Sequence, residues 1–273
     1  MDGMTGYTPL PPTIGDEPSP QRSSAVALVG AGPGDPELLT VKAQRLLDRA
    51  DIVFHDELVS DAILALLGPE VERVPVGKVK GNHSWSQDRI NRALVEAARS
   101  GKRAVRLKGG DPSVFARAGE EIEYLRRHGI EAELVPGVTA ALGCAAAAGF
   151  PLTDRRYAST VMIVSGHVRE GDPTPDWRRV AGPRRTIVVY MGLSNAHEIA
   201  EGLIEAGQDP NTPAALIANG TRAGQRVSTG TLAELGAIAA RHAADDPALL
   251  VIGEVVRLSS EWAPQQPQWT AAW

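Results

Sequence analysis

Short runs of apolar residues alternate along this chain with longer segments in which apolar residues recur every three or four positions. The short runs are typical of buried strands, and the longer segments are typical of amphipathic helices. In the first half this pattern predicts strands at 26–29, 52–54, 71–76, 104–107 and 132–135, and helices at about 36–49, 61–67, 87–99, 114–128 and 138–148. In the second half it predicts strands near 160–164, 186–190, 214–217, 225–228 and 249–252, and helices near 195–206 and 232–242. The alternation predicts an α/β fold with helices on the faces of its sheets.

Proline-rich and charged segments divide this pattern. Residues 1–23 are rich in Pro, Gly, Ser and acidic residues, which predicts a disordered N-terminal extension. Pro151 and the charged residues after it interrupt the alternation, so we expect one α/β domain at 24–151 and a second at 152–258. The proline- and glutamine-bearing residues 259–273 are expected to form a flexible tail.

Composition narrows the class of protein. The 273 residues are 43% hydrophobic and 22% charged, as is typical of a soluble protein with two modest cores. The net charge of −5 argues against general binding to nucleic acid or to a membrane surface. The single cysteine, Cys144, excludes an internal disulfide, and no secretory leader is visible, so we expect a cytoplasmic location. Because no His, Cys, Asp and Glu residues have metal-ligand spacing, we expect no metal.

A glycine-rich loop follows the first predicted strand. Its sequence, Gly30-Ala31-Gly32-Pro33-Gly34, allows the backbone to approach a ligand closely. The third glycine of a dinucleotide fingerprint would fall on Asp35, which argues against that motif. A nucleotide-dependent oxidoreductase remains an alternative at this point, because G-x-G also follows the first strand in such enzymes.

Other predicted strands end in the same kind of loop. Polar or glycine-rich segments occupy residues 55–57, 77–78, 108–112, 136–140, 190–193 and 219–221. Open α/β sheets bind ligands at the carboxyl ends of their strands. The sequence therefore predicts a ligand site at one edge of the fold.

Seven motifs carry a resemblance to a known family. They are GAGPGDPELLT (30–40), HDELVS (55–60), VGK (76–78), RLKGGDP (106–112), VPGVTAALGCAAAAGFPLT (135–153), YMGL (190–193) and NGT (219–221). Together they resemble the tetrapyrrole methyltransferase family over about residues 26–257. The resemblance implies two α/β domains with a cofactor cleft between them, S-adenosylmethionine as co-substrate and a homodimer. KGGDP and YMGL resemble the branch that methylates uroporphyrinogen III at carbons two and seven, giving precorrin-2 for sirohaem or cobalamin.

The resemblance also implies roles for single residues. Asp56 and Lys78 match the proton acceptor and the proton donor of the family. Its cofactor contacts match Pro33, Gly109, Gly110, Asp111, Val114, Thr139, Ala140, Met191 and Gly220. The residue types suit a nucleoside, since glycine admits it to the backbone, a carboxylate accepts ribose hydroxyls and methionine offers apolar contact.

The implied tetrapyrrole substrate carries eight carboxylates, so we expect a basic cleft. Candidate partners are Arg106, Lys108, Arg117, Arg155 and Arg156. The chain departs from the family at Glu57, where an arginine is usual. Two alternatives stay open, a methyltransferase acting on a later corrin intermediate and a non-catalytic homologue that binds tetrapyrrole or cofactor. No dehydrogenase or chelatase segment is visible, so a stand-alone methyltransferase is expected.

Overall fold

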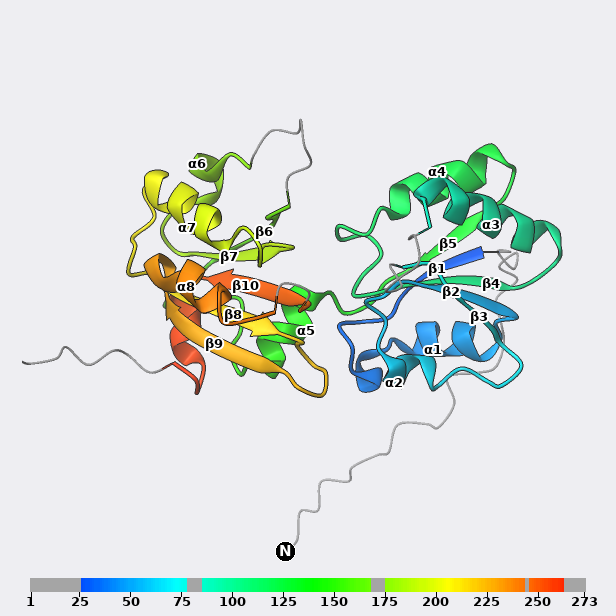
Figure 1. Cartoon of the computed structure of the whole chain (residues 1–273), viewed down its shortest axis with the longest axis horizontal. Coiled ribbons are helices and arrows are strands. Elements are labelled where there is room, and N and C mark those ends of the chain that lie inside the picture. The colour runs from blue at the N-terminus through cyan, green and yellow to red at the C-terminus, as the bar shows by residue number, and fades with distance from the viewer. Residues whose placement is uncertain (1–25, 78–84, 168–174, 244–245, 263–273) are drawn as a thin grey trace, which may run out of the picture.

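Two β-sheets, each covered by helices on both faces, lie side by side (Figure 1). The structure is a computed structural model that describes residues 26–77, 85–167, 175–243 and 246–262. The expected α/β class is confirmed. We call the two halves the first lobe and the second lobe.

The sheet of the first lobe is entirely parallel, in the order β3-β2-β4-β1-β5. Its strands are β1 (Val26–Gly30), β2 (Ile52–His55), β3 (Glu72–Pro75), β4 (Ala104–Lys108) and β5 (Ala132–Val135). Alternate residues of β1 face opposite helical layers, as the period of a strand requires. Ala27 and Val29 pack with α1 (Val41–Asp48) and α2 (Asp61–Leu64). Val26 and Leu28 pack with α3 (Gln87–Arg99) and α4 (Ala118–Arg127).

The sheet of the second lobe is mixed, in the order β6-β7-β10-β8-β9. Its strands are β6 (Thr160–Ser165), β7 (Arg185–Tyr190), β8 (Pro213–Ala218), β9 (Arg226–Thr231) and β10 (Ala248–Ile252). β10 runs antiparallel to both neighbours, so β6, β7 and β8 all end at the same edge. One face is covered by α6 (Trp177–Val180), α7 (Ala196–Glu205) and α8 (Leu235–Ala239).

The first three α-helices of the first lobe each begin after a residue whose side chain caps them. Ser86 caps α3 by accepting a hydrogen bond from the Arg89 amide at 3.2 Å, and the helix has the expected bounds. α4 begins later than the helix expected from residue 114, because Phe115 and Arg117 have left-handed backbones with φ of 51° and 57°. A helix cannot run through such residues.

Helix α5 (Ala140–Ala147) leaves the first lobe and packs on the second. Its Ala141 and Cys144 are buried with Ile217 of β8 and Val251 of β10. The expected domain boundary at 151–152 thus falls after a helix that belongs to the second core. The 3-10 helix η3 (Glu254–Leu258) covers the same face.

The start of the expected C-terminal tail is packed. Ser259 is buried and donates a hydrogen bond to the Ala148 carbonyl at 3.0 Å, and Trp262 packs against the same core. The whole expected N-terminal extension lies outside the described residues, which begin at residue 26. The rest of the expected C-terminal tail, residues 263–273, also lies outside them. Within the part of the chain that the structure describes, no helix is long and apolar enough to cross a bilayer.

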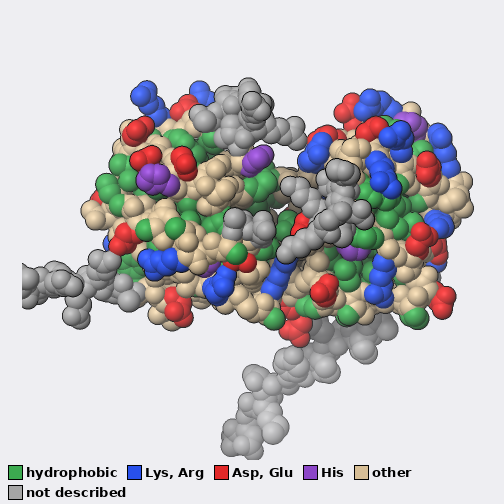
Figure 2. All heavy atoms as spheres, in the orientation of Figure 1, with side chains coloured by type: hydrophobic (Ala, Val, Ile, Leu, Met, Phe, Trp, Pro, Cys, Tyr) green, Lys and Arg blue, Asp and Glu red, His purple; other side chains and the backbone are tan. Residues whose placement is uncertain are grey.

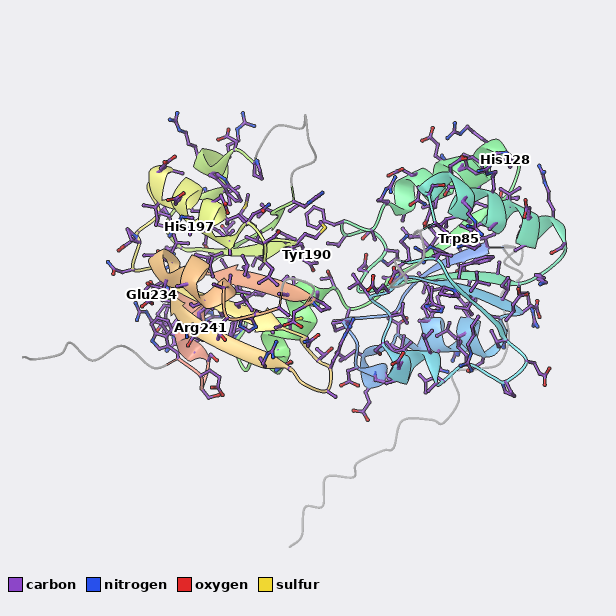
Figure 3. The ribbon with its side chains drawn as sticks, in the orientation of Figure 1. Trp85, His128, Tyr190, His197, Glu234 and Arg241 are labelled. Carbon is purple, nitrogen blue, oxygen red and sulfur yellow. The ribbon has the colours of Figure 1, made fainter. Side chains whose placement is uncertain are left out.

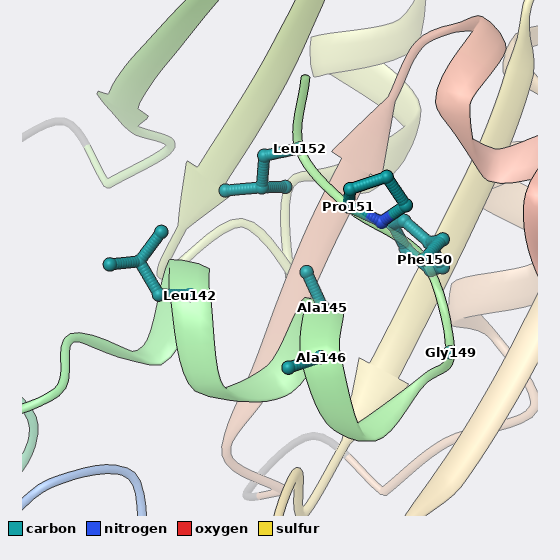
Figure 4. Close-up of a pocket in the computed structure, with 7 residues that line it drawn as sticks. All are labelled: Leu142, Ala145, Ala146, Gly149, Phe150, Pro151 and Leu152. Carbon is teal, nitrogen blue, oxygen red and sulfur yellow. The ribbon is translucent and has the colours of Figure 1, made fainter. Parts of the chain in front are cut away.

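Acidic and basic side chains are intermixed over both lobes on the face shown in Figure 2. A hollow of about 410 Å³ lies beside α5, between Leu142 and Leu152 (Figure 4). Its lining holds no titratable side chain. The polar residues expected to carry chemistry lie elsewhere, at the strand ends.

Candidate functional site

The expected ligand edge forms where the loops after β1, β4 and β5 meet. Backbone pairing continues past the strands, since the amide of Ala31 donates to the Lys108 carbonyl at 2.8 Å. Gly32 and Gly110 then exchange two hydrogen bonds, of 3.1 and 2.7 Å. The glycine-rich loop and the GGDP loop are thereby fixed to each other.

Close backbone approach at this edge requires glycine. A Cβ atom on Gly30 would lie 2.6 Å from the Gly137 amide nitrogen and 2.7 Å from the Gly110 carbonyl oxygen. Real Cβ atoms do not come so near to other atoms. The three loops therefore cross at a point where only hydrogen fits beside the backbone.

Asp111 ties the β4 loop to the β5 loop. Its Oδ1 accepts from the Ser113 amide at 2.8 Å, and its Oδ2 accepts from the Gly137 amide at 3.0 Å. An ionised carboxylate has about four lone-pair positions. Oδ2 thus keeps capacity for a further donor, such as a ribose hydroxyl.

Asp56, at the end of β2, is held as an accessible carboxylate. The Gly109 amide donates to both of its oxygens at 3.3 Å, and the Leu58 amide donates to Oδ1 at 3.1 Å. Its Oδ2 lies 3.9 Å from Arg106 Nη2, and the side chain is 25% exposed. Lys78, the expected proton donor, lies outside the described residues.

The second lobe reaches the same edge through Tyr190, at the end of β7 (Figure 3). Its hydroxyl lies 2.5 Å from Thr139 Oγ1 and accepts from the Ala141 amide at 2.8 Å. Burial raises the pKa of the Tyr190 phenol, which keeps the hydroxyl protonated. Phe115 of the first lobe contacts the Tyr190 ring, with centroids 5.3 Å apart.

Exposed apolar and half-buried residues complete this edge. Met191 follows Tyr190 with a left-handed backbone, and half of its surface is open to solvent. Val114, Thr139 and Ala140 are half-buried. Met191 and the 46%-exposed Phe115 therefore offer apolar surface at the junction of the lobes.

Arg222, which the sequence analysis did not single out, joins the two lobes. Its Nε donates to the Pro33 carbonyl at 3.3 Å, and its Nη2 donates to the Leu58 carbonyl. Burial lowers the pKa of Arg222. Gly220, two residues earlier, packs against Cys144 so closely that a side chain would collide with the sulfur. Pro33 is thus a buried part of the contact between the lobes, whereas the buried Gly220 packs within the second lobe.

Two of the expected substrate-binding cations lie beneath the site. Arg106 and Lys108 are 4% and 3% exposed, and both pair with Glu121, which is fully buried. Burial and the adjacent Arg106 charge lower the pKa of Lys108, while Glu121 opposes that shift. The expected arrangement is corrected here, because these cations are engaged inside the lobe and do not line the cleft.

The other expected cations are exposed. Arg117 pairs with Glu120 through a 2.7 Å contact at the start of α4. Arg155 and Arg156 precede β6, and their carbonyls accept from Arg184 just before β7. Six-residue strands span about 20 Å. The structure thus corrects the expected placement, with Arg155 and Arg156 at the sheet edge opposite Tyr190.

No group of three or more His, Cys, Asp or Glu residues in the described ranges is arranged to hold a metal. The site is instead made of backbone amides, the carboxylates of Asp56 and Asp111 and apolar surface, a set suited to a small polar organic ligand.

Comparison with known proteins decides the family. Residues 25–236 match the tetrapyrrole (corrin/porphyrin) methylases. The chain belongs to this family. The expected resemblance is confirmed, and the oxidoreductase alternative is set aside.

The chain is also similar to individual proteins over most of its length. It is 52% identical over 238 residues to the siroheme synthase of Pseudomonas fluorescens (strain Pf0-1), covering 87% of this chain and 51% of that protein. The chain spans about half the length of the curated relatives it matches. A uroporphyrin-III C-methyltransferase structure from Thermus thermophilus, complexed with S-adenyl homocysteine, shares 44% identity and a TM-score of 0.73. That match covers 85% of this chain and 99% of the other.

A more distant methylase has the same fold. The cobalt precorrin-4 methyltransferase CbiF superposes with a TM-score of 0.75 at 28% identity, covering 85% of this chain and 95% of the other. The two solved structures thus share the fold of this chain to a similar degree but differ in sequence identity to it, at 44% and 28%.

The thiol of Cys144 is expected to react slowly in the folded protein. Burial raises its pKa to about 11, so roughly one thiol in a thousand is ionised at pH 8. As Cys144 is the single cysteine, Ellman's reagent reports on this thiol alone. We expect slow labelling of native protein and rapid labelling in guanidinium chloride. Equal rates in the two conditions would contradict the buried placement.

Proposed function

We propose that this methylase converts uroporphyrinogen III to precorrin-2 by two successive C-methylations, for sirohaem or cobalamin biosynthesis. S-adenosylmethionine is the proposed methyl donor. The similarity to a uroporphyrin-III C-methyltransferase over 99% of that chain supports this substrate. The observation that carries the proposal is Asp56, an accessible carboxylate bound to the amide of Gly109 in the KGGDP loop.

The residues at the lobe junction suit S-adenosylmethionine. Asp111 has acceptor capacity for a ribose hydroxyl, and Gly110 allows close approach to its backbone. Thr139 contacts the Tyr190 hydroxyl and Met191 follows Tyr190 in the chain, so they offer polar and apolar contact next to Tyr190. Bound there, the donor supplies an electrophilic methyl group on a positively charged sulfur. Pro33, Gly109, Val114, Ala140 and Gly220 complete the proposed cofactor set.

Proton transfer is assigned to Asp56 and Lys78. When a pyrrole carbon of the substrate forms a bond to the methyl carbon, the carbon–sulfur bond of the donor breaks and S-adenosylhomocysteine leaves. The methylated ring then carries a positive charge, which it loses by giving up a proton. Asp56, with both oxygens oriented by backbone amides, accepts that proton. Lys78 is proposed as the proton donor from the family resemblance. Positioning of substrate and donor contributes most of the rate, because the reacting atoms must lie in line.

Two further proposals concern assembly and location. The chain forms a homodimer, as the family resemblance implies, and it works in the cytoplasm, as expected in the sequence analysis, on a small-molecule tetrapyrrole. Multi-angle light scattering tests the first, since a mass equal to one chain at micromolar concentration contradicts it. Fractionation of cells that contain the native protein tests the second, and recovery with membranes or secreted material contradicts it.

The deciding assay is anaerobic, with purified protein, enzymatically generated uroporphyrinogen III and S-adenosylmethionine. Mass spectrometry is expected to show the gain of two methyl groups. Binding of S-adenosylhomocysteine without methyl gain would reject this substrate. Activity on a later corrin intermediate would then identify the alternative enzyme, and binding of both ligands without transfer to any tetrapyrrole would identify a non-catalytic homologue.

A further inference from the structure

Glu121 is a fully buried carboxylate that pairs with Arg106 and Lys108. It is not among the site residues that the sequence predicts. It stands in the first turn of α4, and its Oε1 accepts from Arg106 Nε at 3.2 Å and from Lys108 Nζ at 3.0 Å. Its Oε2 accepts from the same Lys108 Nζ at 2.9 Å, and Gln87 adds a 3.0 Å bond to Oε1. Four hydrogen bonds thus hold one carboxylate, which is what burial of a charge requires.

Glu121 helps to fix the direction of the Arg106 guanidinium. Nε of Arg106 is bound to Glu121, and Nη1 donates to the carbonyls of Leu107 at 2.9 Å and Phe54 at 3.3 Å. The guanidinium is planar, so fixing Nε and Nη1 also fixes Nη2. Nη2 is the atom that lies 3.9 Å from Asp56 Oδ2. Rotation of Arg106 would remove this contact.

The four charges balance as a group. Arg106 and Lys108 carry two positive charges, and Glu121 and Asp56 carry two negative charges when both are ionised. Without Glu121, the buried Lys108 would lose the carboxylate with which it pairs, and unpaired buried charge is strongly unfavourable. Glu121 therefore stabilises both cations and also orients the guanidinium of Arg106.

We infer that Glu121 is a positioning residue, which orients Arg106 so that its guanidinium faces Asp56 and fixes that carboxylate for proton acceptance. This inference rests on the proposed role of Asp56. Glu121 acts through Arg106 and touches neither substrate nor cofactor.

The test compares Glu121→Gln with Glu123→Gln, which removes an exposed carboxylate from the same helix. Glutamine keeps the size of Glu121 but lacks its charge. We expect Glu121→Gln to lower kcat about 10- to 100-fold, as a displaced catalytic group does. The KM for S-adenosylmethionine and the calorimetric affinity for S-adenosylhomocysteine are expected to stay within twofold of wild type, roughly the scatter of such comparisons. Glu123→Gln is expected to match wild type throughout.

A second variant keeps the inference testable if the Glu121→Gln protein alone does not fold. Glu121→Gln combined with Lys108→Met removes one charge of each sign and keeps the Arg106 side chain, without the carboxylate that orients it. We expect this pair to restore thermal stability but not kcat. Recovery of wild-type kcat in the pair would show that Glu121 only balances charge, and it would overturn the inference. In an Arg106→Met background, Glu121→Gln is expected to cause no further loss of kcat, because both act through one contact.

A failure of the proposed function can be distinguished from a failure of the positioning inference. If wild-type protein does not methylate uroporphyrinogen III, that proposal fails whatever the variants do. Crystal structures of wild type and of the Glu121→Gln/Lys108→Met pair then decide the positioning inference. Movement of Arg106 Nη2 away from Asp56 supports it, and an unchanged guanidinium overturns it.

Discussion

Replacement of Asp56 by asparagine is expected to lower kcat by about 100- to 10,000-fold, the usual contribution of a positioned base. Asparagine has nearly the same shape, and its amide oxygen can still accept from the Gly109 and Leu58 amides. It cannot accept a proton from the methylated ring. The fold should therefore persist while turnover is lost, which initial rates from the anaerobic mass-spectrometric assay will measure.

Asp88→Asn is the matched control, since Asp88 is an exposed carboxylate paired with Arg92 on α3. We expect it to have wild-type rates. The affinity of Asp56→Asn for S-adenosylhomocysteine, measured by calorimetry, should equal that of wild type. Turnover of folded Asp56→Asn near the wild-type rate would remove Asp56 from the reaction and leave it as a loop-ordering residue.

Gly30→Ala is expected to destabilise the protein by about 3 kcal/mol and to abolish binding of S-adenosylhomocysteine. The added Cβ would lie 2.6 Å from the Gly137 nitrogen and 2.7 Å from the Gly110 oxygen. Both are backbone atoms, which cannot turn aside as a side chain can. The three loops would have to separate at the edge that holds the proposed cofactor. Urea unfolding followed by calorimetry measures both effects.

Gly119→Ala provides the comparison for this prediction. Gly119 lies in α4 with open space where a Cβ would stand. Alanine there is expected to stabilise the protein by about 0.5–1 kcal/mol. A Gly30→Ala protein as stable as Gly119→Ala, with normal ligand affinity, would mean that the loops do not cross as closely as described.

Much of the fold could be predicted because local signals were strong. α3 has an amphipathic pattern and a serine cap, and both of its ends were predicted. The direction of β10 could not be predicted, because a run of buried residues such as Leu249–Ile252 is equally typical of a parallel interior strand. The late start of α4 depends on the left-handed Arg117, which no pattern of apolar residues reveals.

That the glycine-rich loops meet at Gly110 could be predicted from their glycines and from the spacing of the motifs. The positions of the charged side chains could not be predicted. The sequence predicts that Arg106 and Lys108 are free to bind substrate. It does not show that Glu121, which lies on another element, binds both of them. Arg222 gave little signal in the sequence, since its importance comes from carbonyl groups of the other lobe.

The placement of α5 has a consequence for the order in which the chain can fold. The helix is made early in synthesis, directly after β5, yet Ala141 and Cys144 pack against Ile217 and Val251 near the other end of the chain. A nascent chain that has completed the first sheet still carries a helix with an uncovered apolar side. Closing that long sequence separation is slow, and the exposed intermediate is open to aggregation. The helix that joins the lobes therefore makes completion of the second core a condition for protecting the first half of the chain.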